Sequence, residues 1–292
     1  MRALAAIVVA LAVVPAAAQA TVPATAQARL FGIVGNSAQY TALAAMHPSI
    51  RAGYVGFGED VVPTLTSDGA SKATAMFTWT SVSTLSLAQL AAGQADPYLI
   101  RTAKAIRAFR APVYIRFDQE MNGNWFAWSG DPTDFVTAWR HIWNVFRAAG
   151  ANNVRWIWGP DLVVYEPITQ WESVAAYWPG GRYVDVVGPT FVEFASQTNC
   201  EVLCRFARID RLRAAYHKPV WLAETKVNQA ERDPWLRSLR VALSTRPWVR
   251  ALVWSESPSR GQATGQVGTG NMDWSLTSDP LARSLLSTAL KA

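Results

Sequence analysis

The chain contains 292 residues, of which 50% are hydrophobic and 16% charged, and it carries a formal net charge of +6. This composition excludes a disordered, collagen-like or disulfide-rich chain, and the length suits one large domain. The arginines are scattered without a basic cluster or a nucleic-acid motif. We therefore expect a solvated basic surface and no nucleic-acid partner, although such a surface also suits acidic glycans or a cell envelope.

The N-terminus has the pattern of an export signal. Arg2 precedes an apolar run over residues 3–17, and the small-x-small triplet Ala18-Gln19-Ala20 follows. A spanning helix needs about 20 apolar residues, so this run predicts a cleaved signal peptide rather than a membrane anchor. We expect residues 1–20 to be removed, with a second candidate site at Ala26-Gln27-Ala28, and residues 21–292 to form one secreted or periplasmic domain.

Short apolar segments rich in Val, Ile and aromatic residues then alternate with helical stretches. The predicted strands lie near residues 30–34, 53–57, 75–79, 113–117, 154–158, 184–188, 219–223 and 249–254. Parallel strands buried on both faces have this composition. Eight of them alternating with helices predict an α/β fold, a single (β/α)8 TIM barrel, with its site at the C-terminal ends of the strands. A doubly wound sheet is the alternative, but no glycine-rich phosphate-binding turn follows a strand.

Two connecting helices have clear start signals. The first is expected over residues 96–109, with Asp96 as its cap and Pro97 in its first turn. The second follows Asp131-Pro132 and has an apolar face at helical spacing, which we assign to the core: Phe135, Trp139, Ile142, Trp143 and Phe146.

Two of the predicted strands close on a glutamate. Glu120 follows the strand at 113–117, and Glu224 follows the strand at 219–223. Glycoside hydrolysis requires two facing carboxyl groups, one of them with a pKa that partial burial has raised. Either glutamate alone would be interpreted as an exposed or salt-bridged residue at a strand end. Two glutamates in matching positions predict a sugar-cleaving site.

The run from Arg116 to Trp128, Arg-Phe-Asp-Gln-Glu-Met-Asn-Gly-Asn-Trp-Phe-Ala-Trp, resembles the signature of glycoside hydrolase family 26, whose best known members are β-mannanases. Other segments that resemble the family follow the same order, from about residue 30 to the end of the chain: 77–79, 156–160, 177–188, 218–224, 253–254 and 273–274. The resemblance implies a retaining mechanism in which Glu120 is the acid/base and Glu224 the nucleophile.

The aromatic and amide residues of the signature loop are candidates for sugar binding. We expect Trp125 and Trp128 to stack on pyranose rings and Asn124 to bond a hydroxyl group. Arg116 lies inside the fourth strand, where a buried guanidinium needs a carboxylate partner, so we expect it to hold the catalytic carboxylates in place. Three tryptophans that each close a strand are expected at the rim of the site: Trp79, Trp158 and Trp254.

Some residues depart from the family pattern. Gln119 stands where the family has a histidine, and its amide is expected to bond the sugar or the nucleophile. Phe191 stands near the place of a tyrosine that bonds the nucleophile, so we expect it at the site without that bond and Glu224 with a raised pKa. Lys226 is expected on the surface, with pairing to a carboxylate as the alternative.

The chain has 2 cysteines and 3 histidines. In an exported protein, Cys200 and Cys204 are expected to form a disulfide that closes a short loop. The histidines are scattered, so we expect no structural zinc, no other metal and no cofactor.

These observations predict an exported, monomeric, retaining endo-β-glycanase, with β-1,4-mannan as the first choice of substrate because of the family resemblance. Mixed-linkage glucan, β-1,3-xylan and a bacterial exopolysaccharide are alternative substrates. A non-catalytic glycan-binding protein on the same scaffold is the rival from another class, but it has no need for both glutamates. A metal-dependent hydrolase is disfavoured, since no ligand cluster has the required spacing.

Overall fold

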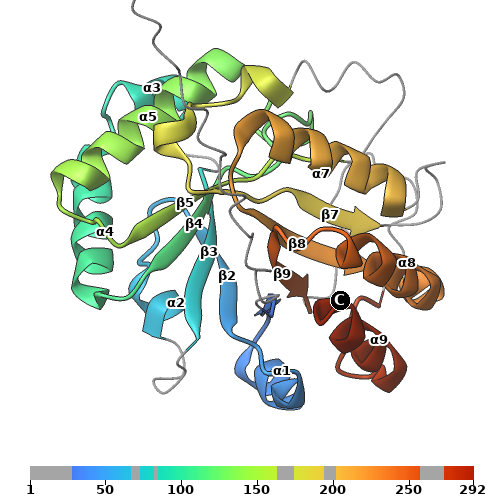
Figure 1. Ribbon diagram of the computed structural model, residues 1–292. Coiled ribbons are helices and arrows are strands. Elements are labelled where there is room, and N and C mark those ends of the chain that lie inside the picture. Colours follow the sequence, from blue (N-terminus) through green and yellow to red (C-terminus); the bar gives the residue numbers. More distant parts are fainter. Residues whose placement is uncertain (1–27, 67–72, 82–84, 163–173, 194–201, 257–272) are drawn as a thin grey trace, which may run out of the picture.

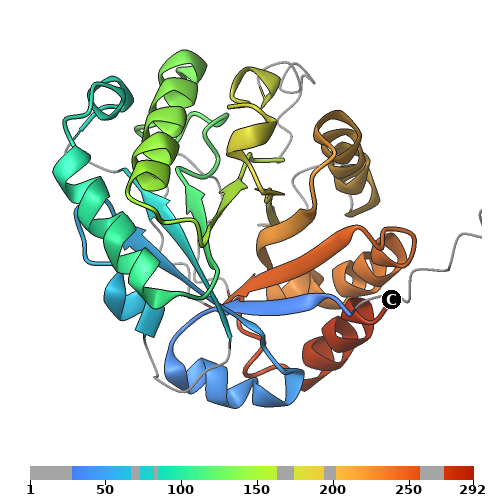
Figure 2. The same cartoon turned by 60° about the vertical axis from the view of Figure 1, so that its left-hand side comes forward.

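The computed structural model describes residues 28–66, 73–81, 85–162, 174–193, 202–256 and 273–292. Parallel strands close into a barrel that helices surround (Figure 1, Figure 2). The strands are β1 (Leu30–Val34), β2 (Ile50–Gly56), β3 (Thr74–Thr80), β4 (Val113–Phe117), β5 (Val154–Trp158), β6 (Val186–Val187), β7 (Thr190–Glu193), β8 (Val220–Val227) and β9 (Val249–Ser255).

The strand order confirms the predicted (β/α)8 barrel. Neighbours follow the chain from β1 to β6, and β8 and β9 close the sheet back onto β6 and β1. Strands β6 and β7 are two pieces of the sixth barrel strand, interrupted at Gly188-Pro189, and β7 continues alongside β8. Gly188 allows a close approach, since a Cβ there would lie 2.2 Å from Cγ2 of Ile157.

The strand bounds differ from the predicted ones in two places that matter for the site. Strand β2 begins at Ile50, three residues before the predicted start, and ends at Gly56. Strand β8 continues to Val227 because β7 pairs with its C-terminal half. Glu224 therefore lies inside a strand, opposite Thr190, rather than just beyond a strand end.

The helices outside the barrel are α1 (Ser37–Ala42), α2 (Val62–Thr66), α3 (Leu87–Ala91), α4 (Asp96–Phe109), α5 (Pro132–Ala148), α7 (Val202–Tyr216), α8 (Arg232–Ser244) and α9 (Pro280–Leu290), with 3-10 turns η1 (Ala44–Met46), η2 (Gly181–Tyr183) and η3 (Gln229–Glu231). Each helix of the described part is too short or too polar to cross a bilayer.

Both predicted helices with start signals are confirmed, and Asp131 caps α5 by accepting from the amide of Asp134. The predicted cap of α4 was wrong. Ala95 precedes the helix, and Asp96 is its first residue, with Oδ1 2.7 Å from Nε2 of His141. Asp96 therefore ties α4 to α5 rather than capping its own helix.

Alternation of side chains along the strands divides the core in two. One cluster fills the inside of the barrel and includes Ala52, Met76, Ile157, Ala223 and Val253. The larger cluster lies between the strands and the helices and contains most of the buried aromatic side chains. Tyr114 stacks on Trp221 with ring centroids 4.3 Å apart and fills the N-terminal end of the barrel.

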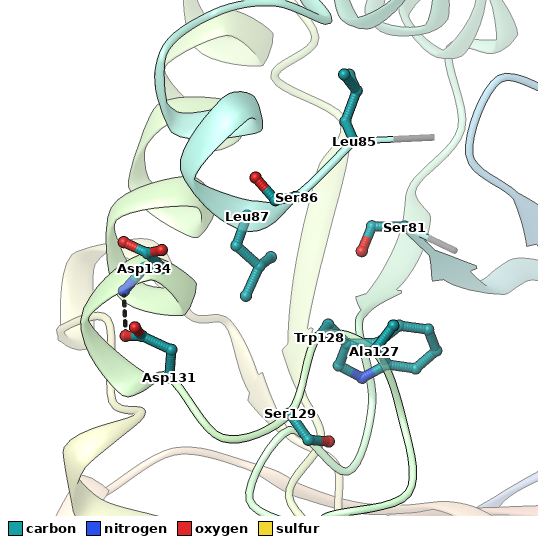
Figure 3. A pocket seen from close by; sticks show the side chains of 9 residues that line it. All are labelled: Ser81, Leu85, Ser86, Leu87, Ala127, Trp128, Ser129, Asp131 and Asp134. Carbon is teal, nitrogen blue, oxygen red and sulfur yellow. Dashed lines mark hydrogen bonds between the residues drawn. The ribbon is translucent and has the colours of Figure 1, made fainter. Parts of the chain in front are cut away.

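A cavity of about 400 Å³ lies beside the N-terminal turns of α3 and α5 (Figure 3). Its lining consists of Ser81, Leu85, Ser86, Leu87, Ala127, Trp128, Ser129, Asp131 and Asp134. The indole N–H of Trp128 donates to the carbonyl of Gln119 at 2.8 Å. The cavity therefore borders the loop that follows β4, although neither Glu120 nor Glu224 lines it.

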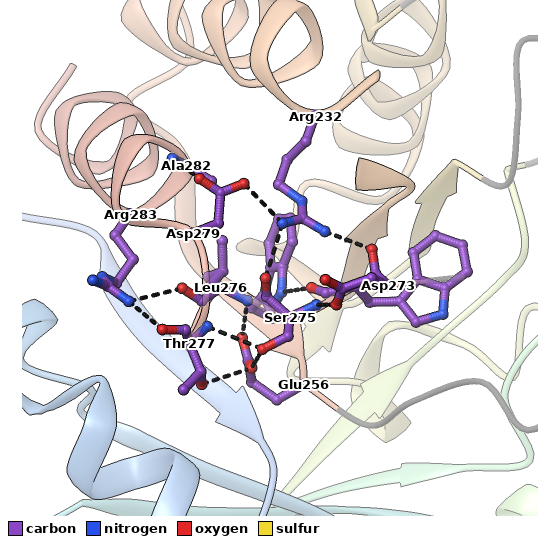
Figure 4. Close-up of polar contacts among 11 residues, drawn as sticks. Arg232, Glu256, Asp273, Ser275, Leu276, Thr277, Asp279, Ala282 and Arg283 are labelled. Atoms are coloured by element: carbon purple, nitrogen blue, oxygen red, sulfur yellow. Dashed lines mark hydrogen bonds and ion pairs between the residues drawn. The ribbon is translucent and has the colours of Figure 1, made fainter. Parts of the chain in front are cut away.

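A buried arginine fastens the C-terminal segment 273–279 to α8 (Figure 4). Arg232 is fully buried, and its Nη1 donates to the carbonyl of Ser275 and to Oδ2 of Asp279, both at 2.9 Å. Its Nη2 donates to the carbonyl of Asp273 at 2.5 Å. The segment is thus held by one guanidinium through three acceptors.

Glu256, which directly follows β9, holds the same segment from the barrel side (Figure 4). Its buried carboxylate accepts bonds from the hydroxyl of Ser275, the amide of Leu276 and the hydroxyl of Thr277. The indole N–H of Trp254 donates to the carbonyl of Trp274 at 2.9 Å. These contacts fix the Trp274 ring beside β8.

Replacing the carboxylate partner of Arg232 tests this network. Asp279→Asn keeps the side-chain oxygen that caps α9 but removes the charge paired with a fully buried guanidinium. We expect the free energy of unfolding to fall by roughly 3 kcal/mol in equilibrium denaturation, as when a buried ion pair loses one member. The matched control is Asp131→Asn at the cap of α5, where asparagine caps equally well and little change is expected. Equal losses in the two variants would contradict the role of the ion pair.

Candidate active site

The inside of the barrel becomes polar toward the C-terminal ends of the strands. Tyr54, Thr78 and Arg116 are register partners on β2, β3 and β4. They follow Ala52 and Met76 at a spacing of two on the face that points into the barrel. Three neighbouring strands therefore present a phenol, a hydroxyl and a guanidinium in one layer.

Glu120 reaches the mouth of the barrel through a sharp turn after β4. Asp118 and Glu120 have φ angles of 41° and 56°, in the left-handed region that non-glycine residues rarely adopt. The amide of Glu120 donates to the carbonyl of Gly159 at 2.8 Å. The buried Asp118 carboxyl accepts two bonds from Ser81, and burial raises its pKa to about 7. Backbone strain of this kind is commonly retained at functional sites.

The Glu120 carboxyl group has two neutral donors. The hydroxyl of Thr190 donates to its Oε1, and the indole N–H of Trp125 donates to its Oε2, both at 2.7 Å. The ring of Trp125 lies against Gly123, where a Cβ would come within 2.6 Å of it. The glycine in the signature loop therefore makes room for the indole that bonds Glu120.

The Glu224 carboxylate is surrounded by cations. Its Oε2 lies 2.9 Å from Nη1 of the fully buried Arg116, and its Oε1 lies 3.3 Å from the ammonium of Lys226. Tyr54, in the same layer of β2 as Arg116 on β4, also acts to lower the pKa of this carboxylate. The two cations come from β4 and β8, so two strands hold Glu224.

Arg116 connects the two glutamates. Its Nη2 donates to the hydroxyl of Thr190, and that hydroxyl donates onward to Glu120. One guanidinium therefore contacts Glu224 directly and Glu120 through a single side chain. The predicted pairing of Arg116 with a carboxylate is confirmed.

The two glutamates differ in acidity. Burial and the negative charge of Glu224 raise the pKa of Glu120, and these effects outweigh Arg116, Thr190 and Trp125, which lower it. Burial also acts to raise the pKa of Glu224, but the charges of Lys226 and Arg116, with the bonds from Arg116 and Tyr54, lower it to about 2. One group is therefore suited to carry a proton while its neighbour stays charged.

The signature loop contains both exposed and buried residues. Asn124 is exposed and Trp125 is partly exposed at the site. Gln119 is 5% exposed, and its side-chain oxygen has no hydrogen-bond partner among the described residues. Trp128 is only 3% exposed and is covered by the ring of Phe126 at a centroid distance of 4.3 Å, so its predicted stacking face is not available.

The predicted rim position of three tryptophans was wrong. Trp79, Trp158 and Trp254 are fully buried in the cluster between strands and helices. Trp79 follows the inward-facing Thr78, so strand alternation turns its indole outward. A position at a strand end in the sequence therefore did not distinguish a side chain at the barrel mouth from one packed between the strands and the helices.

The predicted place of Phe191 at the site was also wrong. Its ring is fully buried against Phe206 and Trp235, at centroid distances of 5.3 and 5.5 Å. The inward position belongs to Thr190. The expected rise in the pKa of Glu224 was wrong as well, because cations and the Tyr54 hydroxyl stabilise the charged form.

Sequence reasoning missed three residues of this site: Tyr54, Thr190 and Lys226. Lys226 was expected on the surface, but its side chain is 17% exposed and its ammonium lies 5.7 Å from the centroid of the Trp274 ring. Tyr54 lies two residues after the inward-facing Ala52, Lys226 lies two residues after Glu224, and Thr190 lies opposite Glu224. Strand register was therefore the signal that would have found them.

No group of three or more metal-binding side chains gathers within the described ranges of the chain. At the barrel mouth, the carboxyls of Glu120 and Glu224 are bonded by the cations Arg116 and Lys226 and by the neutral donors Thr190 and Trp125. The arrangement suits proton transfer to a leaving group on one side and nucleophilic attack on the other.

Comparison with known proteins shows which family this chain resembles. The profile of glycosyl hydrolase family 26 matches residues 97–215, which include the turn that carries Glu120. Over 145 residues the chain is 28% identical to Endoglucanase H of Acetivibrio thermocellus, covering 45% of this chain and 16% of that protein. Over 85 residues it is 33% identical to mannan endo-1,4-beta-mannosidase A and B of Caldalkalibacillus mannanilyticus, covering 26% and 15%. The matches thus span about a sixth of the length of these curated relatives.

Solved structures share the fold at low sequence identity. A family 26 β-mannanase from Bacteroides ovatus superposes with a TM-score of 0.62 at 16% identity, covering 90% of this chain and 88% of that one. A modular endo-β-1,4-mannanase from Cellulomonas fimi gives 0.60 at 14% identity, covering 90% and 71%. The solved structures share the barrel fold, and over residues 97–215 the chain resembles glycosyl hydrolase family 26.

Proposed function

We propose that the protein is a retaining glycoside hydrolase that cleaves a β-linked polysaccharide by double displacement. The observation that carries this proposal is the pair of carboxyl groups with opposite pKa shifts, linked through Arg116 and Thr190. Retaining enzymes hold an acid and a nucleophile about 5–5.5 Å apart on either side of the bond they cleave. A binding protein would have no use for this asymmetry in acidity.

In the first step, Glu120 gives its proton to the departing glycosidic oxygen while a carboxylate oxygen of Glu224 attacks the anomeric carbon. The Glu120 carboxylate that forms keeps the bonds from Thr190 and Trp125, which stabilise its charge. In the second step, Glu120 takes a proton from water, the water oxygen bonds to the anomeric carbon, and Glu224 is released.

The position of Arg116 suits this exchange of charge. Glu224 is negative before the first step and neutral as an ester after it, whereas Glu120 changes in the opposite direction. The guanidinium bonds one carboxyl directly and the other through Thr190, so it faces one negative charge in both states. Little reorganisation of the site is then needed as the covalent intermediate forms.

For the substrate we propose β-1,4-mannan, an assignment that rests on the match of residues 97–215 to the family 26 profile and on the mannanase names among the similar proteins. Mixed-linkage glucan is the second candidate, favoured by the likeness to an endoglucanase. β-1,3-Xylan and an exopolysaccharide stay as further alternatives. Trp125 and Tyr54 keep exposed ring surface at the mouth, and a sugar hydroxyl would satisfy the unpaired amide oxygen of Gln119.

The protein is also proposed to be exported as a monomer with a Cys200–Cys204 disulfide. Residues 1–20 and Cys200 lie outside the described residues, whereas Cys204 belongs to α7. Mass spectrometry of the exported protein should find an N-terminus at Thr21 and, after alkylation without reductant, no modified cysteine. Two alkylated cysteines in native protein would contradict the disulfide.

Truncating each glutamate tests the assigned roles. Glu120→Ala and Glu224→Ala should each lower kcat on β-mannan by at least about 10³-fold, because each removes a group that acts in the transition state. With an aryl glycoside and added azide, Glu120→Ala should yield the β-glycosyl azide, since Glu224 still forms the intermediate. Glu224→Ala should yield the α-anomer by direct attack.

The control for these variants is Glu193→Gln. Glu193 also ends a barrel strand, but it pairs with Arg205 at 2.6 Å outside the site. At equal folded fraction, its kcat should stay near that of the unmodified protein. The assignment fails if either alanine variant turns over mannan at the unmodified rate, or if the two azide products have the same anomeric configuration.

The high-pH limb of activity should respond to the donors that bond Glu120. The acid must be protonated, so activity is lost as the pH rises through its pKa. Thr190→Val and Trp125→Phe each remove a donor that stabilises the charged form, which raises that pKa. We expect the basic limb of the kcat/KM profile to move upward by about one pH unit in each variant. A limb that moves downward would exclude Glu120 as the acid.

A further inference from the structure

Asp118 is the residue at which the chain leaves β4. Its amide continues the pairing of β3 with β4 by donating to the carbonyl of Trp79 at 3.0 Å, and its φ of 41° then turns the chain out of the strand. In a regular parallel ladder, the backbone carbonyl of this residue would accept the amide of Ser81. Here the Asp118 carboxyl accepts that amide at 2.7 Å, so a side chain replaces the backbone in the last hydrogen bond of the ladder.

The carboxyl group that makes this contact is fully buried. Its second oxygen accepts the hydroxyl of Ser81, also at 2.7 Å. A buried carboxyl is unfavourable unless it is bonded, and burial raises the pKa of Asp118 to about 7 although both bonds from Ser81 act to lower it. The charged and the protonated carboxyl each keep an oxygen that can accept the Ser81 amide, so the contact is available on both sides of neutral pH.

We propose that Asp118 is a positioning residue for the acid: its carboxyl completes the ladder between β3 and β4 and so fixes the turn that presents Glu120 to the substrate. The proposal deepens the glycosidase function above and rests on it for the role of Glu120. Because Asp118 is fully enclosed, it acts through Glu120 and not on the substrate itself.

The turn needs such a contact because its backbone is strained. Asp118 and Glu120 both have left-handed φ angles, which persist only where the surrounding structure holds them. The carbonyl of Gln119 accepts the indole N–H of Trp128, and the amide of Glu120 donates to the carbonyl of Gly159, each at 2.8 Å. Both of these bonds lie beyond the point where the chain leaves β4. The Asp118 carboxyl is the side-chain contact that holds the start of the turn.

A small movement of the turn would displace the acid. The Glu120 carboxyl accepts from Thr190 and Trp125 at 2.7 Å, and a shift of about 1 Å would break such bonds and move the proton away from the glycosidic oxygen. Only a poor leaving group needs that proton in the first step. The loss should therefore depend on the leaving group, which a general loss of structure would not produce.

The test is Asp118→Gly, because glycine adopts a left-handed φ readily and the variant loses only the side chain. The probes are phenyl β-mannobioside and 2,4-dinitrophenyl β-mannobioside, whose dinitrophenolate departs without a proton. We expect kcat/KM, which reports the first step, to fall by roughly 10-fold or more for the phenyl glycoside and by less than about threefold for the dinitrophenyl glycoside. Asp118→Ala is the second variant, since it removes the carboxyl without adding backbone flexibility.

Two control variants separate positioning from stability. Asp118→Asn keeps one acceptor oxygen and tolerates the left-handed φ, so it should restore kcat/KM on the phenyl glycoside to within about threefold of the unmodified protein. Asp185→Ala is the matched control, because the Asp185 carboxyl also accepts a strand amide, that of Trp156 at 2.8 Å, but immediately before β6 at the N-terminal end of that strand. It should lower thermal stability and leave the ratio of the two rates unchanged.

The place of Glu120 can be followed without substrate through the indole N–H of Trp125, which donates to it. The 1H–15N signal of this group, assigned with Trp125→Phe, should move in Asp118→Gly toward its position in Glu120→Ala and should stay in place in Asp118→Asn. An unmoved signal in the folded glycine and alanine variants, or equal losses on the two mannobiosides, overturns the proposal. If the signal moves but the unmodified protein hydrolyses neither mannobioside nor any glycan tested, the positioning stands and the glycosidase function fails.

Discussion

The site depends on the burial of one guanidinium inside the barrel. Arg116 is fully enclosed, and an isolated cation there would be strongly destabilising. It is stabilised because its two terminal nitrogens donate to Glu224 and Thr190 at the same layer of the barrel. The two carboxyl groups therefore have fixed places relative to the Arg116 charge. Their pKa values differ in part because Glu224 contacts the guanidinium directly, whereas Glu120 contacts it only through Thr190.

The barrel makes this burial possible by bringing distant segments to one level. Arg116 is separated by 108 positions from Glu224 and by 74 from Thr190, yet parallel pairing aligns all three. The break in the sixth strand at Gly188 is part of the arrangement, since β7 then continues beside β8 and sets Thr190 opposite Glu224. The elements that determine the fold and those that determine the chemistry are thus the same strands.

The sequence predicted the barrel, the helix starts and both glutamates because these depend on local patterns: apolar runs, Asp-Pro starts and strand ends. It misplaced Trp79, Trp158, Trp254 and Phe191, because inward and outward faces alternate with every residue and a strand boundary known to within a residue or two cannot tell them apart. Tyr54 was missed for the same reason, since the predicted strand at 53–57 contained it without showing which face it lies on. Lys226 was missed because β8 is longer than its apolar run, an extension that only pairing with β7 supplies.

The groups that lower the pKa of Glu224 come from separate strands, and this has a consequence for stability. Tyr54, Arg116 and Lys226 belong to β2, β4 and β8, so the low pKa of Glu224 requires all of these strands to be in register. That lowered pKa stabilises the folded state above the unfolded pKa of about 4.3, and the contribution is lost as the pH falls toward about 2. Glu120 acts in the opposite sense, because its raised pKa makes ionisation at neutral pH costly in the folded protein. The difference in acidity between Glu120 and Glu224 is therefore maintained by barrel closure, and a loosened barrel would lose it.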